Sequence, residues 1–347
     1  MASVSHSELT GRVARTGNLE DQCKSTWAKL GEAIEAQDQT GAVELLQFAR
    51  DGECRFVFDI LDEWARELRA LLADRGVDDR DLDAIDHRLR DVLALPDGSA
   101  YDPAAGWQAF SADAARLEAA IQAGEWDRAA GLVEPTCEAW RILHDRVVDM
   151  SYGWMSAWVE RFGEQSVPEM FKAIAQDHFE EFLALGHRAD RGWTDGGCDA
   201  VLLDTIEAMR LHLSTVRRDG APITMVEHDD RFELEFDPCG SGGRALRGDL
   251  VEGTPSRTQE PYNFAVIEGA YEWTDGRAGM CVYCNHCQQI YEQWTIDAVG
   301  IPFLVVDPPT LADGVGHEGA KRCRYTVYKT PEAVPDEVFA RCGRERT

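Results

Sequence analysis

The sequence has few basic residues for its length. Lysine and arginine together number 35, against 63 aspartate and glutamate residues, which gives a net charge of −28. A protein that binds nucleic acid needs a positive surface to displace counterions from phosphate, and an anionic membrane repels an acidic protein for the same electrostatic reason. We therefore expect neither nucleic acid nor a membrane among its partners.

Long apolar runs are also missing. No stretch of about 18 apolar residues occurs, so the sequence predicts no membrane-spanning helix. The first residues, Met-Ala-Ser-Val-Ser-His-Ser-Glu, lack the basic and apolar regions of a secretion signal. These features predict a cytoplasmic protein whose ten cysteines are reduced and suited to metal ligation rather than to disulfide bonds.

Several catalytic motifs are absent from the sequence. It has no Gly-x-Ser-x-Gly elbow, no His-Glu-x-x-His pattern and no Gly-x-Gly-x-x-Gly run that leads from a strand into a helix, which argues against a serine hydrolase, a zincin protease and a Rossmann dehydrogenase. The Glu-x-x-His spacing of di-iron bundles is absent as well.

The most informative stretch that is present is Cys281-Val-Tyr-Cys-Asn-His-Cys287, with three cysteines and a histidine within seven residues. Two thiols separated by two residues can approach one metal ion from a tight turn, as they do in zinc sites. Cys239 and Cys323 lie on either side of this stretch and are candidates to complete the site. We expect zinc held by Cys239, Cys284 and Cys287, with Cys281 or Cys323 as the fourth ligand.

The number of thiolate ligands decides what such an ion can do. Four thiolates make a closed structural site, whereas three leave a position for water, whose pKa zinc lowers to about 7. An iron–sulfur cluster is the alternative, because Cys-x2-Cys-x2-Cys also occurs in ferredoxin-type runs. Here, however, Cys287 is followed by two glutamines. Free thiols packed in the core of a small domain are the third interpretation.

The N-terminal part of the chain predicts a helical bundle, because apolar residues recur at spacings of three and four. A shift of 87 positions superposes residues 27–78 on residues 114–165 without a gap, and Gly76 then lies over Gly163. This match favours the internal duplication of a helical hairpin. Chance similarity between alanine- and leucine-rich helices is the alternative.

The two copies differ where the second becomes polar. His144 and Asp145 stand where the first copy has Val57 and Phe58. A histidine beside a carboxylate within a long helix can line a pocket and act as an acid–base group. An exposed charged stripe, or a histidine held by hydrogen bonds in the core, is the alternative. We interpret His212, farther along, as structural or exposed.

After Ala221 the pattern changes to short runs typical of strands. Phe232, Leu234 and Phe236 alternate with charged residues and predict a hairpin with one buried face. We therefore expect an α+β chain in four parts: a flexible N-terminus (1–19), an all-helical bundle (20–219) in which two further helices follow the repeats, a cysteine-rich metal-binding module on a small antiparallel sheet (220–335), and a polar tail (336–347).

Arg244 ends a glycine-rich run, Cys239-Gly-Ser-Gly-Gly-Arg. Glycines let the backbone approach a ligand closely, and successive N–H groups can bind an anion. An arginine beside them can grip a carboxylate through two hydrogen bonds. The alternative, which is compatible with this, is a turn that only presents Cys239 to the metal.

The order of Cys239, the Cys281–Cys287 cluster and a final Cys323-Arg-Tyr-Thr-Val-Tyr strand resembles the L-2-amino-thiazoline-4-carboxylate hydrolase-like family over about the last 120 residues. The resemblance implies a cytosolic enzyme that acts on a small carboxylated molecule. The glycine-rich run before Arg244 and the presence of His286 depart from the family pattern.

The leading hypothesis is therefore a zinc-dependent hydrolase or lyase. In it Arg244 orients a substrate carboxylate, while His144 and Asp145 supply acid–base chemistry from the helical part. One alternative is a metal, redox or small-molecule sensor, because thiolates around a metal are sensitive to oxidation. Another is an interaction protein that has no catalytic activity and in which zinc holds the cysteine-rich domain together. The apolar helical surface also allows a homodimer.

Overall fold

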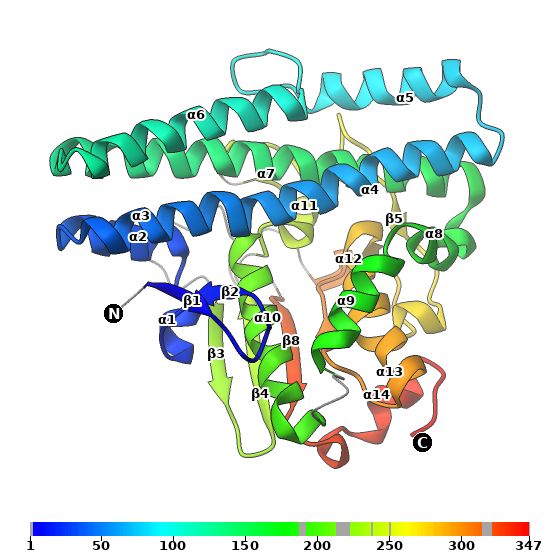
Figure 1. Cartoon of the computed structure of the whole chain (residues 1–347). Helices are drawn as coiled ribbons and strands as arrows, with labels where there is room; N and C mark the ends of the chain where they lie inside the picture. The colour runs from blue at the N-terminus through cyan, green and yellow to red at the C-terminus, as the bar shows by residue number, and fades with distance from the viewer. Residues whose placement is uncertain are drawn as a thin grey trace.

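The computed structural model describes residues 3–186, 192–212, 223–236, 239–249, 251–313 and 321–346. Within them the fold is α+β, as the sequence predicts: the N-terminal region is mostly helical, and antiparallel sheets follow. In Figure 1 the long helices cross the top of the molecule and the largest sheet lies below them. No helix in these ranges is long and apolar enough to span a membrane.

The long helices form one layer. They are α2 (Thr26–Glu35), α3 (Gln39–Gln47), α4 (Arg55–Asp74), α5 (Asp79–Val92), α6 (Pro103–Gln122) and α7 (Trp126–Phe162). A π-helical segment, η1 (Phe48–Cys54), joins α3 to α4. The periodicity of the sequence explains the packing, because α4 buries Val57, Leu61, Leu68 and Leu72 on one face against the rest of the layer.

The two helical hairpins have matching boundaries under the shift of 87 positions. α2 corresponds to the second half of α6, and the α3–η1–α4 run corresponds to α7. Gly76 and Gly163, with φ of 88° and 78°, follow the ends of the two long helices, where glycine adopts a positive φ without strain. α7 stays α-helical where the first hairpin has η1. The common origin of the hairpins remains a prediction.

A four-stranded antiparallel sheet begins the second part of the fold. Its order is β3 (Ile223–Glu227), β4 (Arg231–Phe236), β8 (Cys323–Tyr328) and β7 (Val305–Asp307). The predicted hairpin is confirmed, since β3 pairs with β4 and Phe232, Leu234 and Phe236 are buried. Helix α10 (Cys198–Leu211) packs its apolar side chains into the same core cluster as these strands. Before it come α8 (Val167–Ile174), α9 (Gln176–Gly186) and the short η3 (Trp193–Gly197).

The remaining elements of the cysteine-rich module are short. They are α11 (Gly242–Arg247), β5 (Val266–Ile267), β6 (Met280–Cys281), α12 (Val282–Gln288), the π-helical η5 (Gln289–Gln293), α13 (Trp294–Val299) and α14 (Asp336–Arg341). The tight turn expected for the cysteine motif is wrong, because α12 starts at Val282 and Cys281 is its N-cap.

Both ends of the chain are more ordered than their polar composition indicates. The segment expected to be flexible (1–19) contains the strands β1 (Val4–His6) and β2 (Val13–Arg15), and the helix α1 (Leu19–Cys23) begins at its last residue. The buried Arg15 side chain donates to the Lys24 carbonyl oxygen at 2.8 Å. The expected polar tail forms α14, which buries Val338 and Phe339. A few anchoring contacts are enough to fix a mainly polar segment.

The largest core cluster joins the helical layer to the cysteine-rich module. It contains apolar side chains from α2 to α8 together with Ala245, Leu246, Phe264, Ile267 and Ile290. The boundary expected at 219/220 lies outside the described residues. The shared core places α7 directly against the module.

Candidate active site

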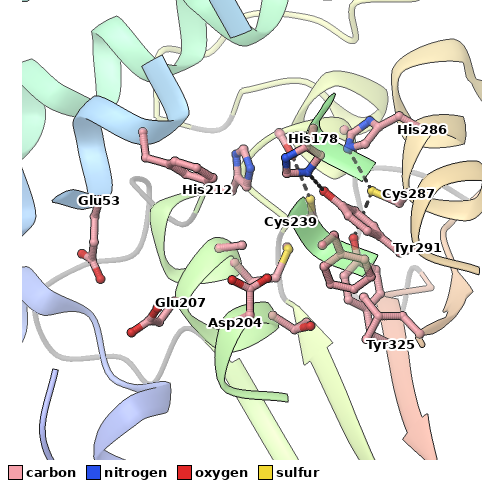
Figure 2. A pocket seen from close by; sticks show the side chains of 18 of the residues that line it. Glu53, His178, Asp204, Glu207, His212, Cys239, His286, Cys287, Tyr291 and Tyr325 are labelled. Atoms are coloured by element: carbon pink, nitrogen blue, oxygen red, sulfur yellow. Dashed lines mark hydrogen bonds between the residues drawn. The ribbon is translucent and has the colours of Figure 1, made fainter. Parts of the chain in front are cut away.

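A pocket of about 440 Å³ lies beneath the long helices, between α9, α10, α12 and the sheet (Figure 2). Its size suits a small organic molecule. The side chains that line it are rich in thiols, imidazoles and phenols: Cys239, Cys284, Cys287, Cys323, His178, His212, His286, Tyr283, Tyr291 and Tyr325. The π-helical segments η1 and η5 both contribute to the wall, and such segments are common at functional sites.

Cys287 has the best-defined surroundings of the pocket thiols. Its Sγ lies 3.2 Å from Nε2 of His286 and accepts a hydrogen bond from the Tyr325 hydroxyl at 3.0 Å. Nδ1 of His286 contacts the carbonyl oxygen of Tyr283. Because a carbonyl only accepts, Nδ1 carries the proton, and Nε2 is left to accept one from the thiol. Burial raises the pKa of Cys287 to about 12 and lowers the pKa of His286 to about 4, so the resting pair is neutral.

The other predicted metal ligands face different partners. Cys281 is buried, and although burial alone would raise its pKa, hydrogen bonds from Cys284 and Tyr152 lower it. Cys239 Sγ lies 3.3 Å from the Ser241 hydroxyl. In the part of the chain that the structure describes, no group of three or more His, Cys, Asp or Glu side chains is placed to hold a metal ion.

The start of α12 explains this arrangement of the thiols. Cys281 caps the helix and contacts Tyr152 of α7, whereas Cys287, near the end of α12, contacts Tyr325 of β8. The five cysteines Cys239, Cys281, Cys284, Cys287 and Cys323 therefore surround one region, and four of them line the pocket. They do not form the preorganised tetrahedral centre that the spacing predicts.

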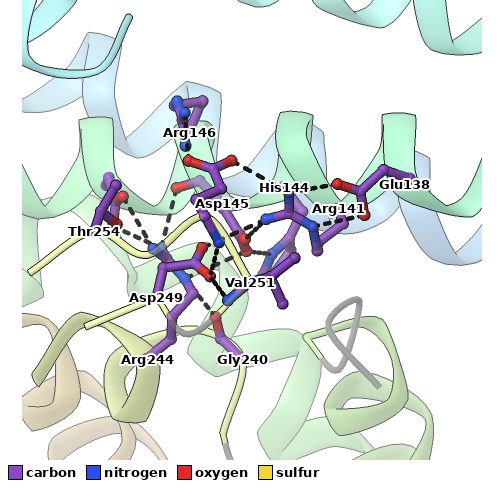
Figure 3. Close-up of polar contacts among 12 residues, drawn as sticks. Glu138, Arg141, His144, Asp145, Arg146, Gly240, Arg244, Asp249, Val251 and Thr254 are labelled. Carbon is purple, nitrogen blue, oxygen red and sulfur yellow. Dashed lines mark hydrogen bonds and ion pairs between the residues drawn. The ribbon is translucent and has the colours of Figure 1, made fainter. Parts of the chain in front are cut away.

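Arg244 lies in a buried network of charges between α7 and the module (Figure 3). Its guanidinium group donates to Asp149 at 2.6 and 3.2 Å and to the carbonyl oxygens of Gly240 and Asp145 at 3.0 and 3.1 Å. It is not among the lining residues of the pocket. The protein's own acceptors therefore occupy Arg244, and its geometry does not support the expected role in orienting a substrate.

His144 and Asp145 reach the pocket through a third residue, His212. Asp145 Oδ1 lies 2.9 Å from His144 Nδ1, and His144 Nε2 lies 3.0 Å from His212 Nδ1. His144 and Asp145 are fully buried, whereas His212 lines the pocket. His212 was expected to be structural or exposed, because it follows α10 and nothing in the local sequence links it to His144, 68 positions earlier.

The charge states fix the direction of these hydrogen bonds. Burial raises the pKa of Asp145, but Arg244, His144 and Arg141 together lower it to about 2. Ionised Asp145 can only accept, so His144 donates from Nδ1, and a neutral His144 accepts at Nε2. His212 beside a neutral His144 donates from Nδ1 and has an unprotonated Nε2. Burial, followed by His144, lowers the pKa of His212 well below its usual range, which keeps this nitrogen a base.

Two further features of the wall were not predicted. His178 Nε2 is 2.7 Å from the Tyr291 hydroxyl, and its buried Nδ1 has no hydrogen-bond partner. Carboxylates occupy another part of the wall, where Arg12 contacts Asp204 at 2.5 Å and Glu207 at 2.7 Å. Among the described lining residues, Arg12 is the only lysine or arginine.

Comparison with known proteins gives no family model, no curated protein and no solved structure that matches the chain. The resemblance to the L-2-amino-thiazoline-4-carboxylate hydrolase-like family stays a prediction. The site is therefore interpreted from its own geometry.

Proposed function

We propose that this protein is an enzyme that binds a small organic molecule in the pocket and uses His212 as the acid–base group of a hydrolase or lyase reaction. The observation that carries the proposal is the chain Asp145–His144–His212, with heavy-atom distances of 2.9 and 3.0 Å. A base held by a second group, which a carboxylate orients in turn, is the arrangement that acid–base catalysis requires.

Stability alone gives no reason for this chain of polar groups. The first hairpin has Val57 and Phe58 at the corresponding positions, and both are buried in the core. A buried polar group costs free energy unless it is hydrogen-bonded, and at best the hydrogen bonds offset that cost. The second hairpin therefore has hydrogen-bonded polar side chains at the positions where the first hairpin has a well-packed apolar pair. A functional role for His212, which lines the pocket and contacts His144, accounts for these polar side chains.

The walls of the pocket favour a substrate that is neutral or cationic and partly apolar. Phe48, Phe56 and Phe182 supply apolar surface. A substrate carboxylate would meet Asp204 and Glu207, which already share the charge of Arg12. The carboxylated substrate inferred from Arg244 would need a cation that the described wall does not offer.

A metal centre is a separate proposal, which the acid–base chain does not require. Zinc, or an iron–sulfur cluster as its alternative, would have to draw together Cys239, Cys284, Cys287 and Cys323, which line the same pocket. Elemental analysis of purified wild type beside a Cys239→Ser variant tests this. Metal that is present in the wild type at one equivalent and lost in the variant would support the centre.

The acid–base proposal is tested with a library of small molecules. Wild type and His212→Asn are incubated with the library, binding is read as thermal stabilisation, and conversion is read by mass spectrometry. We expect both proteins to bind the substrate, with conversion by the variant about 10²–10⁴-fold slower. His87→Asn, at an exposed histidine of α5, is the control. A His212→Asn variant that converts the substrate as fast as wild type would refute the proposal.

A further inference from the structure

The pocket contains a second reactive arrangement that the acid–base chain does not use. Cys287 Sγ is 3.2 Å from His286 Nε2, and the Tyr283 carbonyl holds His286 from the other side. A nucleophile beside a base that a third group orients is the pattern of covalent catalysis. Among the thiols in the described part of the wall, Cys287 is the one that contacts an imidazole at hydrogen-bond distance.

The remaining pocket thiols serve as comparisons. Cys239 lies at hydrogen-bond distance from the Ser241 hydroxyl. Cys284 shares a hydrogen bond with Cys281, and its sulfur packs against the backbone at Gly242. Cys323 lies on β8 in the same pocket, two residues before Tyr325. Cys287 thus differs from its neighbours in having a proton acceptor, His286, and a hydrogen-bond donor, Tyr325, on one sulfur.

We propose that Cys287 is the nucleophile of this enzyme and forms a thioester with an acyl compound, with His286 as its base. This inference rests on the proposed function and deepens it, because it selects a hydrolase of small acyl compounds from the two reaction classes. Tyr325 assists, since its hydroxyl donates to Sγ and so stabilises negative charge that develops there.

In the first half of the reaction, every proton and bond is accounted for by the substrate and by groups in the pocket. The Cys287 S–H proton passes to His286 Nε2 as Sγ bonds to the acyl carbon. The bond from that carbon to its oxygen, nitrogen or sulfur leaving atom breaks, and the leaving atom takes the proton from His286. The products are the thioester and the protonated leaving group, and no oxidant or reductant is needed.

In the second half, water hydrolyses the thioester. His212 Nε2 takes a proton from water as its oxygen bonds to the acyl carbon, and the bond from that carbon to Sγ breaks. The proton returns to sulfur, which leaves Cys287 as a thiol and releases a carboxylic acid. His286 therefore acts on acylation and His212 on deacylation, and separate experiments can distinguish the two.

The test uses 4-nitrophenyl acetate as the probe on the chain of 347 residues. We expect a burst of one equivalent of 4-nitrophenol and one acetyl group that peptide mapping places on Cys287. His286→Asn should slow the burst about a hundredfold or more, as loss of a general base does. Cys287→Ala should abolish it, whereas Cys137→Ser, at a thiol of α7 that does not line the pocket, should leave it intact.

Acetyl groups on another thiol, or none while the probe labels surface lysines, would overturn the inference. Peptide mapping of the wild type requires no variant, so a folding defect in Cys287→Ala cannot obscure this result. The two proposals also fail separately. If His212→Asn acetylates and releases acetate like wild type, the role of His212 fails while Cys287 stands. If Cys287→Ala keeps the burst but His212→Asn loses turnover, the role of Cys287 as nucleophile fails while the role of His212 stands.

Discussion

Asp149 gives the clearest test of whether the buried charges beneath α7 hold the molecule together. Asp149, Arg244 and Arg257 are all fully buried. Arg244 donates to the two carboxylate oxygens at 2.6 and 3.2 Å, and Arg257 donates to one of them at 2.7 Å. Removal of one partner from such a group leaves the other charges uncompensated in a region of low dielectric constant.

We predict that Asp149→Asn lowers the free energy of unfolding by about 3–5 kcal/mol, the range for a broken buried ion pair. The number of hydrogen bonds lost gives a similar decrease in the free energy of unfolding. The amide keeps one acceptor and turns its NH2 toward a guanidinium, so one or two of the three bonds are lost at about 1.5–3 kcal/mol each.

Urea denaturation followed by tryptophan fluorescence measures this change. The matched control is Asp59→Asn, because the Arg55–Asp59 pair has the same residue types but side chains that are 44% and 49% exposed. We expect this control to change stability by less than about 1 kcal/mol. An Asp149→Asn variant no less stable than the control would contradict the account of the network.

Three further predictions follow from the contacts described. Asp145, whose pKa is lowered from 3.8 to about 2, should contribute about 2 kcal/mol of stability above about pH 4. This contribution should disappear as the pH falls through 2, so Asp145→Asn should flatten that part of an acid denaturation curve. Gly242→Ala should destabilise the fold by about 1–3 kcal/mol, since an added Cβ would lie well inside 3.0 Å of Cys284 Sγ. The double variant Gly242→Ala/Cys284→Ala should recover most of the loss by the same urea assay. His144→Phe should slow deacetylation of Cys287 and spare the burst, as read by mass spectrometry over time.

The sequence predicted features that depend on local periodicity. The alternation at Phe232, Leu234 and Phe236 predicted the β3–β4 hairpin correctly, and the spacing of apolar residues predicted the long helices. The polar pair at His144 and Asp145 differs from Val57 and Phe58, its counterparts in the first hairpin, and all four side chains are buried.

Features that depend on distant partners could not be predicted from the sequence. Arg244 was assigned to a substrate because nothing local reveals Asp149, its partner 95 positions earlier in the chain. The spacing of Cys281, Cys284 and Cys287 does not determine where each sulfur points once α12 begins at Val282. His212 was interpreted as structural or exposed for the same reason, since only the fold brings it to His144.

The most direct test of the account is the protonation of His212 at neutral pH, measured by ¹⁵N-correlated NMR of the histidine side chains. A neutral ring with its proton on Nδ1 and an unprotonated Nε2 is predicted, because a neutral His144 that donates to Asp145 from Nδ1 accepts at Nε2, which lies 3.0 Å from His212 Nδ1. Replacement of His144 by phenylalanine should remove this preference. A wild-type His212 that is protonated on Nε2 would contradict the claim that it presents a base to the pocket.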